Sequence, residues 1–180
     1  MLSGKKILLG VTGSIAAYKA AYVIRLLIKS GASVRVIMTE SAKDFITPLT
    51  LSSLSKNPVN HLPFDPVTGE WYSHVDLGNW ADVFLIAPAT ANTMAKMVTG
   101  ICDNLLLATY LSASCPVFIA PAMDVNMFNH PATQNNIKTL RARKNVIINP
   151  VSGELASGLI GEGRMAEPVD IVSEIEKFLK

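Results

Sequence analysis

Residues 7–14 read Ile7-Leu-Leu-Gly-Val-Thr-Gly-Ser14, an apolar run that ends in a glycine-containing turn. The run is almost uninterrupted by polar residues, as in a parallel strand that is covered on both faces. The segment from Ile15 to Ser30 has helical character, and Gly31 is placed to end that helix as its C′ residue. A strand, a tight turn and a helix in this order predict the beginning of an α/β fold.

Four further apolar runs resemble the first, and stretches of helical character separate them. They are Val34–Met38, Val83–Ala87, Val117–Ala120 and Val146–Ile148. A last helix is expected to begin at Pro168, because proline is favoured at the first helical position. Five strands that alternate with helices predict a three-layer α/β fold, a parallel sheet with helices on both faces. Ligands of such sheets bind beyond the carboxyl ends of the strands, so the informative side chains should follow the strands.

The composition narrows the class of protein. The chain has 180 residues, the size of one domain, and we expect a single domain over 1–180. Apolar residues make up 49% and charged residues 17%, which suggests that part of the surface is buried against other subunits. The net charge of +2 with scattered Lys and Arg does not favour a nucleic-acid partner. No apolar run reaches the roughly 18 residues of a membrane span, so no membrane partner is expected.

The two cysteines predict neither a metal site nor a disulfide framework. Cys102 and Cys115 form no C-x-x-C pair, and no histidine lies near them at ligand spacing. We expect no metal and two reduced thiols in a cytoplasmic protein.

Two segments fit neither a strand nor a helix. The stretch from Asn57 to Gly78 carries three prolines. We expect it to form a long excursion that extends over the edge of the sheet where the active site lies. The stretch from Ser152 to Met165 holds four glycines in fourteen residues. We interpret it as a mobile loop that closes over a ligand, a substrate flap.

The turns after the first two strands carry hydroxyl groups. Backbone N–H groups at the turn before Ile15, with Ser14 and Thr12 as hydroxyl donors, suit a phosphate. The turn is not G-x-G-x-x-G and lacks the lysine of a Walker loop, and a tight turn that needs Gly13 only for its geometry is an equal alternative. Thr39 and Ser41 could contact a phosphate or a ribityl chain, or they could simply cap a helix.

The turns after the third and fourth strands favour contact with a planar ligand. Pro88-Ala-Thr-Ala-Asn-Thr93 has three small polar side chains where a helix cap would need one, so a ligand contact is favoured. In Pro121-Ala-Met-Asp124, Met123 is a soft apolar contact suited to a flavin or a thioether, whereas Asp124 could be a helix cap. Asp103 could also cap a helix, and Asn104 could hydrogen-bond the edge of a ring.

His74 is the candidate for proton transfer. In Ser73-His-Val-Asp-Leu77, an extended backbone would place His74 and Asp76 on one side. Histidine is the side chain best suited to move a proton near neutral pH, although a purely structural histidine is an equal alternative.

In this order and spacing, the motifs resemble the homo-oligomeric flavin-containing cysteine decarboxylase family over nearly the whole chain. Its members closest to this chain act on 4′-phosphopantothenoylcysteine. The motifs that carry the resemblance are Gly13-Ser-Ile-Ala-Ala-Tyr-Lys19, Ser73–Leu77, Pro88–Thr93, Asp103-Asn-Leu105, Pro121–Asp124 and Gly158-Leu-Ile-Gly-Glu-Gly-Arg-Met165.

The resemblance implies a flavodoxin-like (Rossmann-like) fold with FMN at the subunit interface of a homotrimer, which can pack further into a homododecamer. It also implies a possible fusion or association with a phosphopantothenoylcysteine synthetase domain. The expected cofactor contacts are Gly13, Ser14, Thr39, Ser41, Phe45, Pro88, Ala89, Thr90, Ala91, Asn92, Thr93, Asp103, Asn104, Leu105, Ala122 and Met123.

The implied reaction is FMN-dependent decarboxylation of 4′-phosphopantothenoylcysteine to 4′-phosphopantetheine in coenzyme A biosynthesis. A hydride leaves the carbon next to sulfur, CO₂ is lost, and the hydride returns with a proton. The expected catalytic residues are His74 and Ser157, and the expected substrate contacts are Asp124, Arg164 and Met165. A non-catalytic FMN-binding regulatory subunit is an alternative. The related flavin prenyltransferases share the fold, but Pro121–Asp124 and Gly161–Met165 argue against them.

Two positions depart from the family pattern. Asp124 stands where the family usually has Asn, which replaces an amide by an acceptor-only carboxylate. Ser157 stands where the family usually has Cys, and a hydroxyl is a far weaker acid than a thiol. Ser157 could relay a proton from water, or Glu154 or Glu162 could replace it as the donor. Alternatively, the reaction could stop at an enethiol, as in oxidative decarboxylation of C-terminal peptide cysteines. An engineered Cys-to-Ser replacement would give the same sequence.

Overall fold

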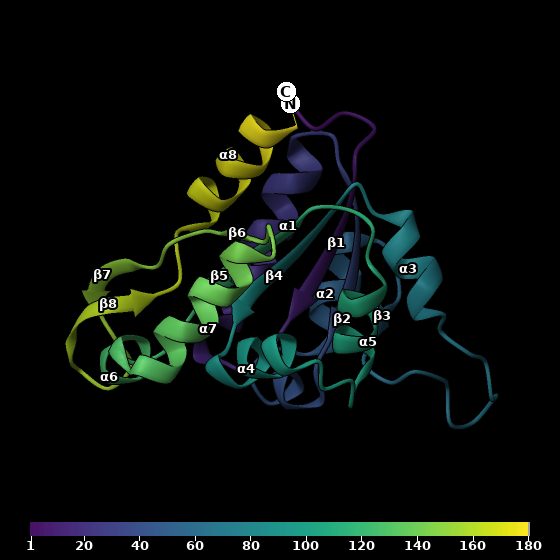
Figure 1. Ribbon diagram of the computed structural model, residues 1–180. Coiled ribbons are helices and arrows are strands. Elements are labelled where there is room, and N and C mark those ends of the chain that lie inside the picture. The colour runs from purple at the N-terminus through teal and green to yellow at the C-terminus, as the bar shows by residue number, and fades with distance from the viewer. Residues whose placement is uncertain (180) are drawn as a thin grey trace.

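The computed structural model describes residues 1–179, which form an α/β fold around a parallel sheet of six strands (Figure 1). The strands are β1 (Lys6–Val11), β2 (Ser33–Met38), β3 (Val59–Asn60), β4 (Val83–Ala89), β5 (Val117–Pro121) and β6 (Val146–Ile147). The five predicted strands are confirmed, within two residues at either end. The edge strand β3 was not predicted.

The helices that cover the sheet are α1 (Lys19–Lys29), α2 (Pro48–Ser55), α3 (His74–Trp80), α4 (Ala91–Thr99), α5 (Leu105–Ser112), α6 (Val125–Asn129), α7 (Pro131–Ala142) and α8 (Pro168–Phe178). Two short 3-10 helices, η1 (Ile15–Tyr18) and η2 (Glu40–Asp44), follow β1 and β2. The helix predicted over Ile15–Ser30 therefore begins with a 3-10 turn, and it ends at the predicted Gly31, which has a φ of 93°.

Two hydrophobic cores lie on opposite faces of the sheet, so the three-layer prediction is confirmed. One core joins the sheet to η1, α1, α2 and α8, with Val23, Ile24 and Ile171 among its buried residues. The other core joins it to α3, α4, α5 and α7, with Leu106 and Leu140 among its buried residues. Every residue of β4 is buried, as expected of a central strand covered on both faces.

The strand order is β3-β2-β1-β4-β5-β6, and all neighbouring strands are parallel. The chain builds the sheet outward from β1 in one direction and then from β4 in the other, so the topological switch point lies between β1 and β4. Without the short edge strand β3, the remaining five strands have the order of a flavodoxin-like sheet. The crevice beyond the carboxyl ends of β1 and β4 is where ligands of such sheets bind.

The flap segment is an ordered hairpin, not the irregular loop that we predicted. β7 (Val151–Glu154) and β8 (Ile160–Arg164) pair antiparallel, with Glu154 opposite Ile160. The hairpin lies beside α6 and away from α3 (Figure 1). The hairpin and α6 therefore form one wall beside the carboxyl end of β5.

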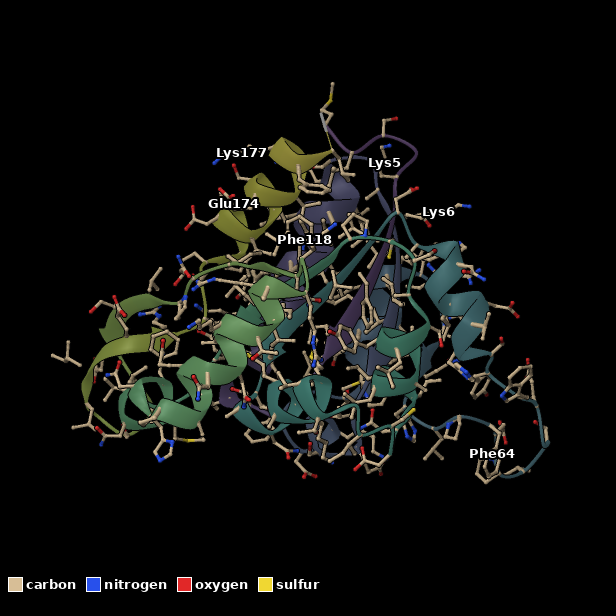
Figure 2. The ribbon with its side chains drawn as sticks, in the orientation of Figure 1. Lys5, Lys6, Phe64, Phe118, Glu174 and Lys177 are labelled. Atoms are coloured by element: carbon tan, nitrogen blue, oxygen red, sulfur yellow. The ribbon has the colours of Figure 1, made fainter. Side chains whose placement is uncertain are left out.

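The predicted excursion begins with β3 and ends with α3, and its middle part, 61–73, is irregular. A bridge between Phe64 and Trp71 closes it on itself. Figure 2 shows Phe64 far from the sheet, so this segment projects outward rather than lying over the strand ends.

The single-domain prediction covers 1–180, of which Lys180 lies outside the described residues. Within 1–179, no helix is long and apolar enough to cross a membrane. The same residues contain no group of three or more His, Cys, Asp or Glu side chains placed to hold a metal ion.

Candidate active site

Thr12 and Gly13 connect the turns that follow β1, β2 and β4. The Thr12 hydroxyl donates a hydrogen bond of 2.7 Å to the oxygen of Pro88 and accepts one of 3.1 Å from the N–H of Thr90. A Cβ atom on Gly13 would lie 2.5 Å from Oγ of Ser41, so only glycine lets these two turns approach so closely. The Thr12 hydroxyl is buried and already donates its only proton to Pro88. The suggestion that it donates to a phosphate is therefore wrong.

The turns that Thr12 and Gly13 join display several of the predicted cofactor side chains. Oγ1 of Thr39 lies 3.2 Å from Oγ of Ser41. Phe45 leaves 46% of its surface exposed at the end of η2, and Asn92 is exposed in the first turn of α4. Thr90 caps α4, and its hydroxyl accepts a hydrogen bond of 3.2 Å from the N–H of Thr93.

A cavity of about 630 Å³ lies between η1, the turn after β5 and the flap hairpin; we call it the flap cavity. It brings together the predicted substrate side chains and part of the predicted cofactor set. The predicted residues that line it are Ser14, Ala122, Met123, Asp124, Ser157, Arg164 and Met165.

Gly163 fixes the flap hairpin against the turn after β5. The N–H of Met123 donates a hydrogen bond of 3.0 Å to the oxygen of Gly163. Gly163 has a φ of 142°, and a Cβ atom there would lie 2.3 Å from the oxygen of Met123. This position therefore requires glycine for both its backbone conformation and its contact.

Ser157, between β7 and β8, meets Asp124 across the flap cavity. Its hydroxyl donates a hydrogen bond of 2.5 Å to Oδ2 of Asp124. Oδ1 of Asp124 accepts a bond of 3.2 Å from the N–H of Asn126, so Asp124 also caps α6. The two positions that depart from the family pattern are thus direct partners.

Lys19 is a cavity residue that the sequence prediction missed. Its side chain is 4% exposed, and Nζ donates hydrogen bonds to the oxygen of Met165 at 2.8 Å and to Oε1 of Glu167 at 2.9 Å. Arg164 also contacts Oε1 of Glu167, at 3.1 Å. The hydrogen bond from Lys19, with the charges of both cations, lowers the pKa of Glu167. Both cations beside the flap cavity therefore already have an anionic partner.

The predicted contacts Asp103, Asn104 and Leu105 have structural roles in this chain. Asp103 forms an ion pair with Lys96, and Asn104, rather than Asp103, caps α5 by accepting a bond of 2.9 Å from the N–H of Leu107. The side chain of Leu105 is buried in the second core. Only the exposed edge of this turn is left to contact a ligand.

His74 does not join the flap cavity. The extended conformation considered for this segment is wrong, because Ser73 caps α3 and His74 is its first residue. The ring of His74 lies edge-on to Trp71, with the ring centres 6.3 Å apart. Figure 1 shows α3, which begins with His74, on the opposite side of the molecule from the hairpin of β7 and β8, whose turn carries Ser157.

A doubly wound parallel sheet with polar turns at its switch point and an adjoining cavity defines a protein that binds a nucleotide or a flavin. A family model described as Flavoprotein matches residues 1–180. The chain belongs to this flavoprotein family.

Two curated relatives are similar over much of the chain. A cysteine/cysteine sulfinic acid decarboxylase from an unknown prokaryotic organism is 66% identical over 133 residues, 74% of this chain and 37% of that protein. The coenzyme A biosynthesis bifunctional protein CoaBC of Vibrio cholerae serotype O1 is 47% identical over 177 residues, 98% of this chain and 44% of that protein. The chain thus spans less than half the length of these curated relatives.

Two solved structures share the fold. A mutant PPC decarboxylase complexed with pantothenoylaminoethenethiol has a TM-score of 0.84 and 33% identity, covering 97% of this chain and 98% of that one. The FMN-dependent cysteine decarboxylase SpaF has a TM-score of 0.82 and 32% identity, covering 97% of this chain and 96% of that one. The similarity in fold to these two decarboxylases therefore extends over nearly the whole chain.

Proposed function

We propose that this chain catalyses the FMN-dependent decarboxylation of 4′-phosphopantothenoylcysteine to 4′-phosphopantetheine in coenzyme A biosynthesis. The observation that carries the proposal is the contact of Ser157 with Asp124 in a cavity that opens beside the sheet's switch point. Similarity to CoaBC and to the solved PPC decarboxylase over nearly the whole chain supports it.

The turns at the switch point fit FMN. They combine hydroxyl groups, glycine at the closest approach, and small or flat side chains beside a helix start, which suits a phosphate and a ring. The residues that would hold FMN are Gly13, Ser14, Thr39, Ser41, Phe45, the segment Pro88–Thr93, the exposed edge of Asp103–Leu105, Ala122 and Met123. When bound, FMN supplies reversible hydride acceptance, which allows a carboxylate next to a thiol-bearing carbon to leave as CO₂.

The residues of the flap cavity position the substrate and the proton. Asp124 receives the substrate nitrogen, and the hairpin excludes water from the reacting carbon. Ser157 takes the position of the acid, and its hydrogen bond to Oδ2 of Asp124 holds the hydroxyl in the flap cavity. Glu154 also lines the flap cavity and is a second candidate donor, whereas Glu162 is exposed on β8 outside it.

His74 acts as the base in this proposal, from a neighbouring subunit. In its own chain His74 lies on α3, away from the flap hairpin, so an assembly must bring His74 and the flap cavity together. Ile15, Tyr18 and Tyr22 are 50–60% exposed around η1 and α1, which supports association of copies. We propose a homotrimer, which could pack further into a homododecamer. A phosphopantothenoylcysteine synthetase domain or subunit and a cytoplasmic location belong to the same proposal.

The mass of the product tests the proposed reaction. Purified flavin-loaded protein is incubated with 4′-phosphopantothenoylcysteine, and loss of CO₂ alone is the expected result. Loss of CO₂ together with two hydrogens would instead establish the oxidative reaction, and the test is then repeated with peptides that end in cysteine. An unchanged substrate mass would contradict the proposal and favour the regulatory FMN-binding alternative.

Decarboxylation of cysteine itself is a second candidate function. It is favoured by the relative with 66% identity, which is a cysteine/cysteine sulfinic acid decarboxylase. Cysteine in the same assay distinguishes this candidate, because its expected product is cysteamine.

A further inference from the structure

Asp124 is a carboxylate in the flap cavity without a cationic partner. None of the ion pairs formed among residues 1–179 includes Asp124. The two cations that line the flap cavity, Lys19 and Arg164, are both bound to Glu167. The cavity therefore presents an uncompensated negative charge at the point where Ser157 meets Asp124.

Asp124 also has hydrogen-bonding capacity to spare. A carboxylate offers about four acceptor sites, and the N–H of Asn126 and the hydroxyl of Ser157 use one each. A substrate amine can therefore reach Asp124 without displacing the helix cap or the flap contact. Because the side chain is half-buried, the charge of such an amine matters more there than in open solvent.

We infer that Asp124 selects cysteine substrates whose α-amino group is free and positively charged, over those whose nitrogen is acylated. A free ammonium gives Asp124 an ion pair and up to three donors, whereas an acylated nitrogen gives it one neutral N–H. This inference rests on the proposed decarboxylation at this site and assigns its substrate class, and it places free cysteine, the second candidate substrate, ahead of 4′-phosphopantothenoylcysteine.

The reaction on such a substrate balances without a further reactant. The bond between the α-carbon of cysteine and its carboxylate breaks, CO₂ leaves, and the α-carbon gains one proton. The product is cysteamine, and the hydride removed from the carbon next to sulfur returns to it. Overall the step consumes one proton and leaves the oxidation level unchanged.

A pair of thiols that differ only in charge tests the selection directly. Cysteamine is cationic and N-acetylcysteamine is neutral, and calorimetric titration of the flavin-loaded protein gives the dissociation constant of each. We expect tighter binding of cysteamine, and Asp124→Asn should reduce the ratio of the two constants by about 10- to 100-fold, as expected when a charged hydrogen bond becomes a neutral one.

The Asn side chain keeps the fold intact in this test. Asn is as good a helix cap as Asp and can still accept the hydrogen bond from Ser157. Glu162→Gln is the matched control, because it removes an exposed carboxylate of the flap hairpin that lies outside the flap cavity, and it should change the ratio less than threefold.

Turnover assays separate this inference from the proposed function. The ratio of kcat/KM for cysteine to kcat/KM for 4′-phosphopantothenoylcysteine should fall at least about tenfold in Asp124→Asn. An unchanged ratio, or a preference of the unaltered protein for N-acetylcysteamine, overturns the inference. Turnover of 4′-phosphopantothenoylcysteine without any turnover of cysteine also overturns it but leaves the proposed function standing. If neither cysteine nor 4′-phosphopantothenoylcysteine is turned over, the proposed function itself is contradicted.

Discussion

The ammonium group of Lys19 donates a hydrogen bond of 2.8 Å to the main-chain oxygen of Met165, 146 residues further along the chain. A second bond, to Glu167, supplies the opposite charge that a buried ammonium requires. The two bonds fix the end of the flap hairpin and the start of α8 onto α1. The stability of the flap is thereby linked to the first helix of the fold.

Glu167→Gln should destabilise the protein by about 1–2 kcal/mol. The change leaves the ammonium of Lys19 buried without a carboxylate, which is costly, although the 46% exposure of Glu167 reduces the effect through solvent screening. Urea unfolding of the flavin-loaded protein measures the difference.

Glu174→Gln is the control for this measurement. Glu174 pairs with Lys177 on the outer side of α8, where Figure 2 shows the two side chains in solvent. An exposed pair of this kind contributes little to stability, so Glu174→Gln should cost clearly less than Glu167→Gln. Equal losses for the two variants would show that the burial of Lys19 does not matter.

The ion pair of Lys19 with Glu167 also predicts that part of the stability is lost in acid. The hydrogen bond from Lys19 lowers the pKa of Glu167, so the folded state binds the proton less readily than the unfolded state. This contribution is complete above the ordinary value of 4.5 and is lost as the pH falls through the lowered pKa. Unfolding free energies measured from pH 6 down to about pH 3 should fall less steeply in Glu167→Gln than in the unaltered protein. Parallel curves would contradict the prediction.

Gly163→Ala should displace or destabilise the flap hairpin, because the new Cβ atom would lie 2.3 Å from the oxygen of Met123. We expect a loss of about 2 kcal/mol or more and faster hydrogen exchange of the Met123 N–H. Gly158→Ala is the matched control: its φ of 83° is also unfavourable for alanine, but no atom lies within 4 Å of the new Cβ. Its cost should be only about 1 kcal/mol. A similar exchange rate in both variants would argue against the Met123 contact.

The sequence predicted the central strands because β1, β4 and β5 are buried on both faces, and burial leaves an uninterrupted apolar run. It did not predict β3, whose two residues are only partly buried at the edge of the sheet. Burial does alternate along β7 and β8, but most of their more buried positions are glycine, so no alternation of large apolar and polar side chains marked the two strands.

Among the site residues, those that follow strands were placed correctly at the carboxyl edge, because that rule depends only on strand order. Lys19 was missed, because a lysine at the start of a helix is usually exposed and its burial depends on a segment 146 residues away. The helical start at His74 did have a signal, since Ser73 stands three residues before Asp76, in the position of a helix cap.

The two cysteines of the protein, Cys102 and Cys115, should differ in reactivity. Cys102 is exposed, whereas Cys115 is partly buried between α5 and β5, and burial raises the pKa of its thiol. Because the thiolate is the reactive form, iodoacetamide at pH 8 should label Cys102 roughly tenfold faster. Mass spectrometry of the digested protein gives both rates, and Cys102→Ser should leave only the slow phase. Faster labelling of Cys115 would contradict the burial that the structure assigns to it.

Subunit mixing tests whether His74 and Ser157 belong to one active site. Each of the variants His74→Asn and Ser157→Ala should lower turnover of 4′-phosphopantothenoylcysteine by about 100-fold when it is assembled alone. If each site takes His74 from one subunit and Ser157 from the next, random assembly of the two variants at equal amounts pairs two intact residues in about one quarter of the sites. Co-expressed variants should therefore recover about one quarter of the normal activity, whereas separately purified oligomers mixed without exchange should recover none.

Failure to recover activity in verified mixed oligomers would mean that His74 and Ser157 act within one chain, or that His74 is not part of the mechanism. Because His74 and the flap cavity lie on different sides of a single chain, we expect recovery.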